Sequence, residues 1–337
     1  MKTSGFDLTV GIPTYNRGKQ LLESLIQICQ EAQRYDKKIE ILISDNASSD
    51  NTYSIVKKIQ AEYDLVINYY KNDDNYGFDY NVDNVIKKAQ SNFVLVMSDD
   101  DILMKDSLSH YFSCIQHDPA INLAIGKAYF MDHNLQSEII GFSDHAFDHF
   151  SDNKIYYFAN GNALLNFTEK LFCGISGVMF NKIEYIKENM DEFMQSQFIH
   201  TAAIFKMLSK NDSTVAIINI PVLVYRLGDK NTKIKSPEEI VKVGFGLLNL
   251  LIKIKPLYGS TIWYGLYGKE LTWVRRTLLG IKSREGLSQD IIQRYKELLD
   301  NERNYKFLDT LIAKLPDNVF KPVYWFYRLI KYKKNGY

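Results

Sequence analysis

The sequence has few cysteines: Cys29, Cys114 and Cys173 are the only three among 337 residues. Three widely spaced cysteines provide neither a disulfide framework nor the ligand spacing of a metal site, which favours a reducing compartment. The first residues lack the apolar core of a secretory signal. No run reaches the roughly 18 apolar residues that a membrane-spanning helix needs. We therefore expect a cytoplasmic protein, soluble or peripheral to a membrane.

Two phosphate-binding patterns are also missing. The chain has no glycine-rich dinucleotide turn and no Gly-Lys-Ser/Thr phosphate loop, which disfavours dehydrogenases and P-loop kinases. A composition of 46% hydrophobic and 24% charged residues is ordinary for a globular protein and argues against disorder.

The net charge of +1 hides an uneven distribution. Residues 251–337 hold 17 Lys and Arg against 8 Asp and Glu, which leaves 24 against 32 for the first 250 residues. The last segment, Phe320–Tyr337, mixes aromatic residues with five cations, a pattern typical of an interfacial membrane helix. An ordinary terminal helix packed on the body is the alternative. Nucleic acid is a poorer partner, because the front half is acidic and carries no recognition motif.

The first 120 residues alternate between apolar, β-branched runs and segments with helical periodicity. This rhythm predicts a mostly parallel sheet covered by helices on both faces, an α/β fold. The expected strands are Phe6–Ile12, Ile39–Ser44, Val66–Tyr70 and Phe93–Met97, followed later by Gly174–Phe180 and Val215–Arg226.

After about Ile125 this regular alternation ends. The polar segment Ser143–Asn153 is expected to be a loop, and a helix is expected near His200–Leu208. We predict three parts: a nucleotide-binding half over residues 1–125, an acceptor-binding half over residues 126–235, and a basic helical region over residues 236–337.

Polar residues follow each of the first four strands. Ligands bind at the carboxyl ends of the strands in an open parallel sheet, so these residues are expected to form one site. Tyr15 and Arg17 lie where a phosphate or nucleobase would pass, and Asp45 is suited to accept a hydrogen bond from a base. The four segments are Pro13–Arg17, Asp45–Ser48, Asn72–Gly77 and Ser98–Asp101.

Three consecutive aspartates, Asp99 to Asp101, follow the fourth strand. Adjacent carboxylates repel one another unless a cation or protonation relieves them. Hard oxygen ligands suit Mg²⁺ or Mn²⁺, ions that substrate phosphates and water usually complete. The alternative is that these aspartates cap the helix that begins near Lys105.

Four ordered motifs over about 105 residues resemble those of the family 2 glycosyltransferases, which have the GT-A fold: LTVGIPTYNR, ILISDNASSDNT, NDDNYGFDYN and FVLVMSDDDIL. The chain looks most like bacterial enzymes of the abequosyltransferase type, which add a sugar to lipid-linked O-antigen or capsule units. The resemblance implies a nucleotide-sugar donor, such as a UDP-, CDP- or TDP-sugar, and a lipid-linked oligosaccharide acceptor.

The resemblance also implies roles for individual residues. Asp101 would bind the metal directly, with Asp99 beside it. The donor would contact Pro13, Thr14, Tyr15, Arg17, Asp45, Asn46, Gly77, Asp99, Asp100 and Arg226. From the residues alone, Arg226 is equally consistent with a lid over the diphosphate and with a surface ion pair.

The chain departs from the family in two places. The pair that follows Gly77 is Tyr80-Asn81 rather than Arg-Asn, so one cation is missing. Many inverting members also place a Glu-Asp pair at the start of the acceptor-side helix as the catalytic base. That pair is absent, and the candidates are His200 and Asp191, whose alternatives are a structural histidine and a solvated helix end.

Together these patterns predict a metal-dependent glycosyltransferase that acts on a cell-surface glycan intermediate at the inner face of the cytoplasmic membrane. Two alternatives remain. One is a nucleotidyltransferase that makes a nucleotide sugar, and the other is a non-catalytic nucleotide- or glycan-binding module on the same fold.

Overall fold

The computed structural model describes residues 5–131, 138–142, 145–168, 174–226, 237–284 and 286–302, together with residues 309, 312, 314–316 and 319–322. Contacts within the chain separate it into two compact units, Met1–Asp229 and Lys230–Tyr337.

The first unit is built on one mixed sheet with the strand order β3-β2-β1-β4-β9-β6-β10-β5, with β7 paired to β6 and β8 to β10. Strands β1 to β4 pair in parallel, and β9 runs antiparallel to both β4 and β6. The strands are β1 Leu8–Thr14, β2 Ile39–Asp45, β3 Val66–Lys71, β4 Phe93–Val96, β5 Ile102–Leu103, β6 Leu123–Met131, β7 Glu138–Phe142, β8 Ile155–Phe158, β9 Val178–Asn181 and β10 Val215–Arg226.

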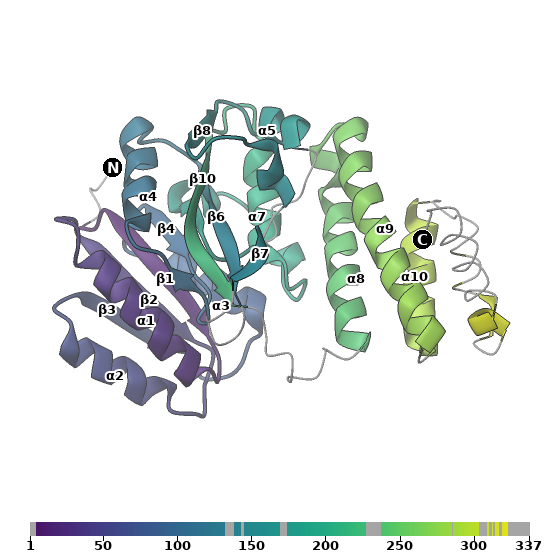
Figure 1. Ribbon diagram of the computed structural model, residues 1–337, viewed down its shortest axis with the longest axis horizontal. Coiled ribbons are helices and arrows are strands. Elements are labelled where there is room, and N and C mark those ends of the chain that lie inside the picture. Colours follow the sequence, from purple (N-terminus) through teal and green to yellow (C-terminus); the bar gives the residue numbers. More distant parts are fainter. Residues whose placement is uncertain are drawn as a thin grey trace. The chain divides into compact units, whose positions relative to one another are not determined.

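Helices flank this sheet in two groups (Figure 1). Helix α1 packs with α2 and α4, whereas α3 packs with α6 and α7. The helices of this unit are α1 Gly18–Ala32, α2 Thr52–Glu62, α3 Phe78–Lys88, α4 Ser107–His117, α5 Gly161–Thr168, α6 Lys182–Tyr185 and α7 Ile199–Leu208, with 3-10 turns η1 His145–His149 and η2 Asp191–Phe193.

The hydrophobic pattern explains this packing. Leu8, Val10 and Ile12 alternate along β1 and share one core with Leu21 and Leu25, which recur at helical spacing in α1. Burial of these apolar faces is the main stabilising contribution to the layered arrangement.

The second unit is helical in its described residues and consists of α8 Pro237–Ile254, the turn η3 Lys255–Leu257, α9 Ser260–Arg284 and α10 Gln289–Glu302. Its interior holds a bidentate ion pair between Arg275 and Asp309, with both N–O distances 2.7 Å. Tyr295 also donates to Asp309, so this buried carboxylate is fully paired. No helix among the described residues of either unit is long and apolar enough to cross a bilayer.

The sequence-based strands are confirmed within a few residues, and Val215–Arg226 is matched at both ends. The expected loop Ser143–Asn153 is wrong in part, because His145–His149 forms a 3-10 turn. Phe147 of that turn is buried, which supplies the tertiary contact that sequence periodicity does not reveal. Residues 143–144 lie outside the described residues, as do residues 323–337 of the expected interfacial helix.

Candidate functional site

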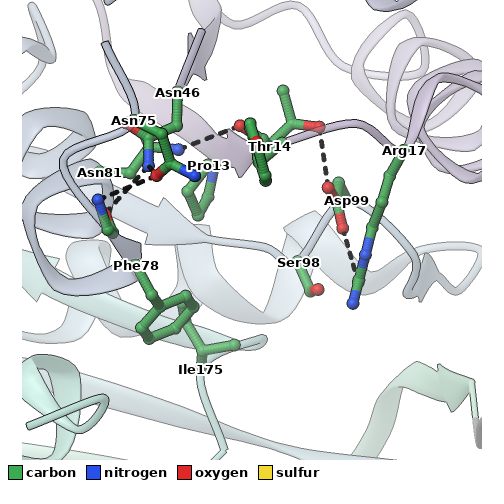
Figure 2. Close-up of a pocket in the computed structure, with 12 residues that line it drawn as sticks. Pro13, Thr14, Arg17, Asn46, Asn75, Phe78, Asn81, Ser98, Asp99 and Ile175 are labelled. Carbon is green, nitrogen blue, oxygen red and sulfur yellow. Dashed lines mark hydrogen bonds and ion pairs between the residues drawn. The ribbon is translucent and has the colours of Figure 1, made fainter. Parts of the chain in front are cut away.

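A cavity of about 330 Å³ opens at the carboxyl edge of the parallel strands (Figure 2). It is lined by the last residues of β1, by the loops after β1, β2, β3 and β4, by the first turns of α3 and by the segment before β9. These residues are Pro13, Thr14, Tyr15, Arg17, Asn46, Asn75, Gly77, Phe78, Asn81, Ser98, Asp99 and Ile175. The four polar loops therefore meet at one place, as the strand order predicts.

The charged side of the cavity joins the end of β1 to the loop after β4. The Thr14 hydroxyl donates to Asp99 Oδ2 at 2.8 Å, and Arg17 lies 3.1 Å from Asp99 Oδ1 (Figure 2). Arg17 also lies 2.7 Å from Asp100 Oδ2. The Arg17 side chain is half-exposed, so its guanidinium can bind an anion that enters the cavity.

Asn46, at the end of β2, holds the opposite side of the cavity together. Its Nδ2 donates to Asn75 Oδ1 at 2.6 Å and to the Gly77 carbonyl at 3.1 Å. Its Oδ1 accepts from Asn72 Nδ2 at 3.0 Å and from the Tyr76 amide at 3.1 Å. All four hydrogen-bonding positions of this buried amide are therefore used.

Two further residues complete this side. Gly77, the N-cap residue directly before α3, has φ of +90°, a conformation that a residue with a side chain rarely adopts. Asn81 Nδ2 donates to the carbonyls of Thr14 at 3.2 Å and Ser44 at 2.9 Å, which ties α3 to β1 and β2.

Asp45 lies at the end of β2 but does not line the cavity. Its buried carboxylate accepts from the Ser48 amide at 2.8 Å and from the Tyr69 hydroxyl. In this structure Asp45 therefore organises the loop behind the cavity. Its contact with a nucleobase stays a prediction.

The three aspartates after β4 have different surroundings. Asp101 Oδ2 accepts from the Ser176 hydroxyl at 2.5 Å, and Oδ1 accepts from the Arg226 amide at 3.0 Å. Burial, followed by the charge of Asp100, raises the pKa of Asp101 to about 7. Burial also raises the pKa of Asp99 to about 6, although Arg17 opposes the shift.

These carboxylates fit a divalent cation by their chemistry. The two donors to Asp101 are a hydroxyl and an amide, neither of which carries charge, so its buried carboxylate gains from a cation. Within the described part of the chain, no group of three or more His, Cys, Asp or Glu could hold a metal ion. A metal at Asp99 and Asp101 would therefore need oxygen ligands from elsewhere, such as substrate phosphates and water.

Arg226 ends β10 and is anchored near the aspartates. Its Nε donates to the Asp100 carbonyl at 2.9 Å, and its Nη2 lies 2.6 Å from Glu23 Oε2 of α1. Arg226 thus forms an ion pair, but its side chain is only 10% exposed, so this is not the surface pair of the alternative. Its contact with a donor stays a prediction.

The two candidates for the catalytic base occupy different environments. His200 is buried in the first turn of α7, and its ring lies 5.9 Å from that of Phe78, which lines the cavity. Asp191 is exposed in η2. His200 is thus adjacent to a cavity wall, and neither side chain lines the cavity itself.

Phe78, Asn81 and Ile175 line the cavity but lie outside the four segments that the sequence predicts to form the site, whereas Asn75 and Ser98 lie inside two of them. Phe78 and Asn81 lie inside the third motif, NDDNYGFDYN, which indicates their position. Ile175 precedes β9, and the antiparallel pairing of β9 with β4, a contact between distant parts of the sequence, brings it to the cavity.

Comparison with known proteins identifies the class. The family model described as glycosyl transferase family 2 matches residues 9–185, which is more than half of the chain, and the chain belongs to this family. The family and the GT-A fold that the sequence motifs predict are therefore confirmed.

Individual curated relatives match only part of this chain. An abequosyltransferase of Salmonella typhimurium is 38% identical over 29% of this chain and 29% of its own length. A GalNAc(5)-diNAcBac-PP-undecaprenol beta-1,3-glucosyltransferase of Campylobacter jejuni is 35% identical over 30% of this chain and 32% of its own. The chain thus matches about a third of the length of these curated relatives.

Solved structures extend the likeness in fold. Residues 1–349 of Staphylococcus aureus TarS, in complex with UDP-GlcNAc, give a TM-score of 0.66 at 13% identity, covering 98% of this chain and 92% of that one. The mannosyltransferase PcManGT of Pyrobaculum calidifontis, in complex with GDP-Man and Mn²⁺, gives 0.51 at 15% identity, covering 94% and 86%.

Proposed function

We propose that this protein transfers a sugar from a nucleotide-sugar donor to a hydroxyl of a glycan acceptor, with the help of Mn²⁺ or Mg²⁺. The observation that carries the proposal is the cavity itself, in which Arg17, Thr14 and Asp99 face an amide side built on Asn46. A guanidinium group and a hydroxyl group suit the oxygens of a diphosphate, and side-chain amides suit the polar edge of a nucleobase.

The donor would occupy the cavity with its diphosphate near Arg17 and the aspartates. Asp101 and Asp99 would hold the metal, which acts as a Lewis acid on the diphosphate when bound. Tyr15 and Pro13 line the same cavity and are the proposed contacts of the base and ribose. The complexes of TarS with UDP-GlcNAc and of PcManGT with GDP-Man support a donor of this class.

For the catalytic base we propose His200 ahead of Asp191, because His200 contacts a residue of the cavity wall. A base must come within hydrogen-bond reach of the acceptor hydroxyl, and catalytic geometry often tightens only when substrates are bound. Replacement of the true base should lower kcat by about 10²- to 10⁴-fold with a smaller effect on donor binding.

The proposed acceptor is a lipid-linked oligosaccharide of O-antigen or capsule assembly. The Campylobacter relative is a glucosyltransferase named for an undecaprenol-linked acceptor, which supports this class, and the Salmonella relative is an abequosyltransferase. We further propose that residues 126–235 form the acceptor side and that the basic region, residues 236–337, meets the inner face of the cytoplasmic membrane. The cations of Phe320–Tyr337 would each add about 1 kcal/mol of attraction to an anionic surface.

A transfer assay tests the function. The protein is incubated with UDP-, CDP-, GDP- and TDP-sugars, Mn²⁺ and lipid-linked acceptor extracted from bacteria. A glycosyltransferase releases nucleoside diphosphate and enlarges the glycan. A parallel incubation with nucleoside triphosphates and a sugar 1-phosphate would release pyrophosphate if the protein were a nucleotidyltransferase. Donor binding without either product would indicate a binding module.

A further inference from the structure

Ser176 lies in the segment before β9, beside the cavity-lining Ile175. Its side chain is only 2% exposed. Its hydroxyl donates to Asp101 Oδ2 at 2.5 Å and accepts from the Ser98 amide at 2.8 Å. Because the amide donor faces a lone pair of Oγ, the hydroxyl hydrogen is directed toward Asp101.

The backbone around Ser176 is also fixed. The Tyr225 hydroxyl donates to the Ser176 carbonyl at 3.0 Å, and the Tyr111 hydroxyl donates to the Gly177 carbonyl at 2.8 Å. These bonds come from β10 and α4, two elements remote in sequence from residue 176. The position of the Ser176 hydroxyl is therefore set by the surrounding fold.

The two oxygens of the Asp101 carboxylate are held by different groups, one by the backbone and one by a side chain. Oδ1 accepts from the Arg226 amide at 3.0 Å, and Oδ2 accepts from Ser176. Each carboxylate oxygen has two lone pairs, so one on each remains for a metal ligand bond. Loss of the Ser176 hydroxyl would free the carboxylate to rotate about its side-chain torsions.

We propose that Ser176 is a positioning residue: it fixes the orientation of the Asp101 carboxylate for a divalent cation bound together with a nucleoside diphosphate. The inference rests on the proposed function, because it requires that Asp101 meets a metal. Partners that orient a metal ligand typically change metal affinity by about 10- to 100-fold when they are removed.

The experiment measures Mn²⁺ binding from the six-line electron paramagnetic resonance signal of the free ion. The full-length wild type and Ser176→Ala are titrated with Mn²⁺ alone and with saturating UDP, CDP, GDP or TDP. Nucleotide affinity is also measured in EDTA. Ser213→Ala is the matched control, because the Ser213 hydroxyl is equally buried, donates to the Lys210 carbonyl and accepts from the Gly161 amide.

We expect Ser176→Ala to weaken Mn²⁺ binding by about 10- to 100-fold and to leave nucleotide affinity in EDTA within about twofold. Ser213→Ala should change neither. Equal Mn²⁺ affinity in Ser176→Ala and wild type would overturn the inference. So would a matching loss of nucleotide affinity in EDTA, which indicates a purely structural role.

A wild type that binds no Mn²⁺ with any nucleotide would refute the metal dependence of the proposed function, and this inference with it. If Ser176→Ala does not fold, Tyr225→Phe provides a second variant. It removes the donor to the Ser176 carbonyl and retains Oγ, so a smaller loss of Mn²⁺ affinity in the same direction is expected.

Discussion

The amide of Asn46 offers a sharp test of how the cavity is built. Asn46→Asp keeps the size and shape of the side chain and the two accepted hydrogen bonds, from Asn72 and Tyr76. It removes both donated bonds and turns a carboxylate oxygen toward Asn75 Oδ1 and the Gly77 carbonyl. The substitution therefore tests only the hydrogen bonds that the buried Asn46 side chain donates.

The expected magnitude follows from those two bonds. Asn75 Oδ1 still accepts from the Gly77 amide, and the Gly77 carbonyl still accepts from the Asn81 amide. The cost is therefore that of two lost hydrogen bonds, about 0.5–1.5 kcal/mol each, or about 1–3 kcal/mol in all. The substitution should destabilise the segment Asn72–Gly77, because Asn46 holds that segment in place by hydrogen bonds. A change of 2 kcal/mol in the free energy of local opening corresponds to about 30-fold faster amide exchange.

The measurement is hydrogen exchange by mass spectrometry over residues 72–78. Tryptophan fluorescence is unsuitable, because all three tryptophans (Trp263, Trp273 and Trp325) lie in the second unit. Asn84→Asp is the control: Asn84 Nδ2 donates one bond, to Asn72 Oδ1 at 3.2 Å, from a half-buried position. We expect its effect to stay below about 1 kcal/mol.

Because Asn75, Gly77 and Phe78 line the cavity, Asn46→Asp should also weaken nucleotide binding. Exchange in Asn46→Asp within threefold of the wild type, with unchanged nucleotide binding, would refute the reasoning that this amide holds the cavity wall.

Other predictions concern single contacts. Arg17→Gln should weaken nucleoside diphosphate binding by about 10- to 100-fold in calorimetry, because charge-assisted hydrogen bonds contribute about 1.5–3 kcal/mol, and it should change stability by less than about 1 kcal/mol. The pKa of Asp101 is raised in the folded state, so its protonated form contributes stability that is lost as pH rises through about 7. In EDTA, the melting temperature of Asp101→Asn relative to wild type should therefore increase between pH 5 and pH 8; a constant difference would contradict this. Gly174→Ala places a Cβ 1.9 Å from the Tyr225 hydroxyl, so it should lower the melting temperature, and Tyr225→Phe in the same chain should recover part of the loss. For the base, His200→Gln should lower kcat more than Asp191→Asn; the reverse order in a transfer assay would reassign the role.

Much of the donor side could be predicted from the sequence, because its signals are local. Each of the first four strands is a short apolar run followed directly by polar residues, and the parallel pairing brings those ends together. Thr14, Arg17 and Asp99 were identified in this way, and the structure joins them by hydrogen bonds.

The later part of the site depends on long-range pairing. Strand β9 inserts antiparallel between β4 and β6, which brings Ser176 to Asp101 although 75 residues separate them. Likewise, Asp45 follows a strand as a ligand residue would, but its carboxylate turns to Ser48 and Tyr69. A residue's position at a strand end is local information, whereas the direction of its side chain depends on neighbours from other elements.

The most direct test of the central claim is a thermal-shift panel. The full-length protein is melted with UDP, CDP, GDP or TDP, each with Mn²⁺ and with EDTA, and unfolding is followed by calorimetry so that both units are observed. Ligands that bind the folded state raise the melting temperature by mass action. We predict that one nucleotide stabilises the protein in the presence of Mn²⁺ and that Asp101→Ala abolishes the metal-dependent part. No stabilisation by any of the four nucleotides, in either condition and with lipid-linked acceptor added, would contradict a nucleotide-sugar site in this cavity.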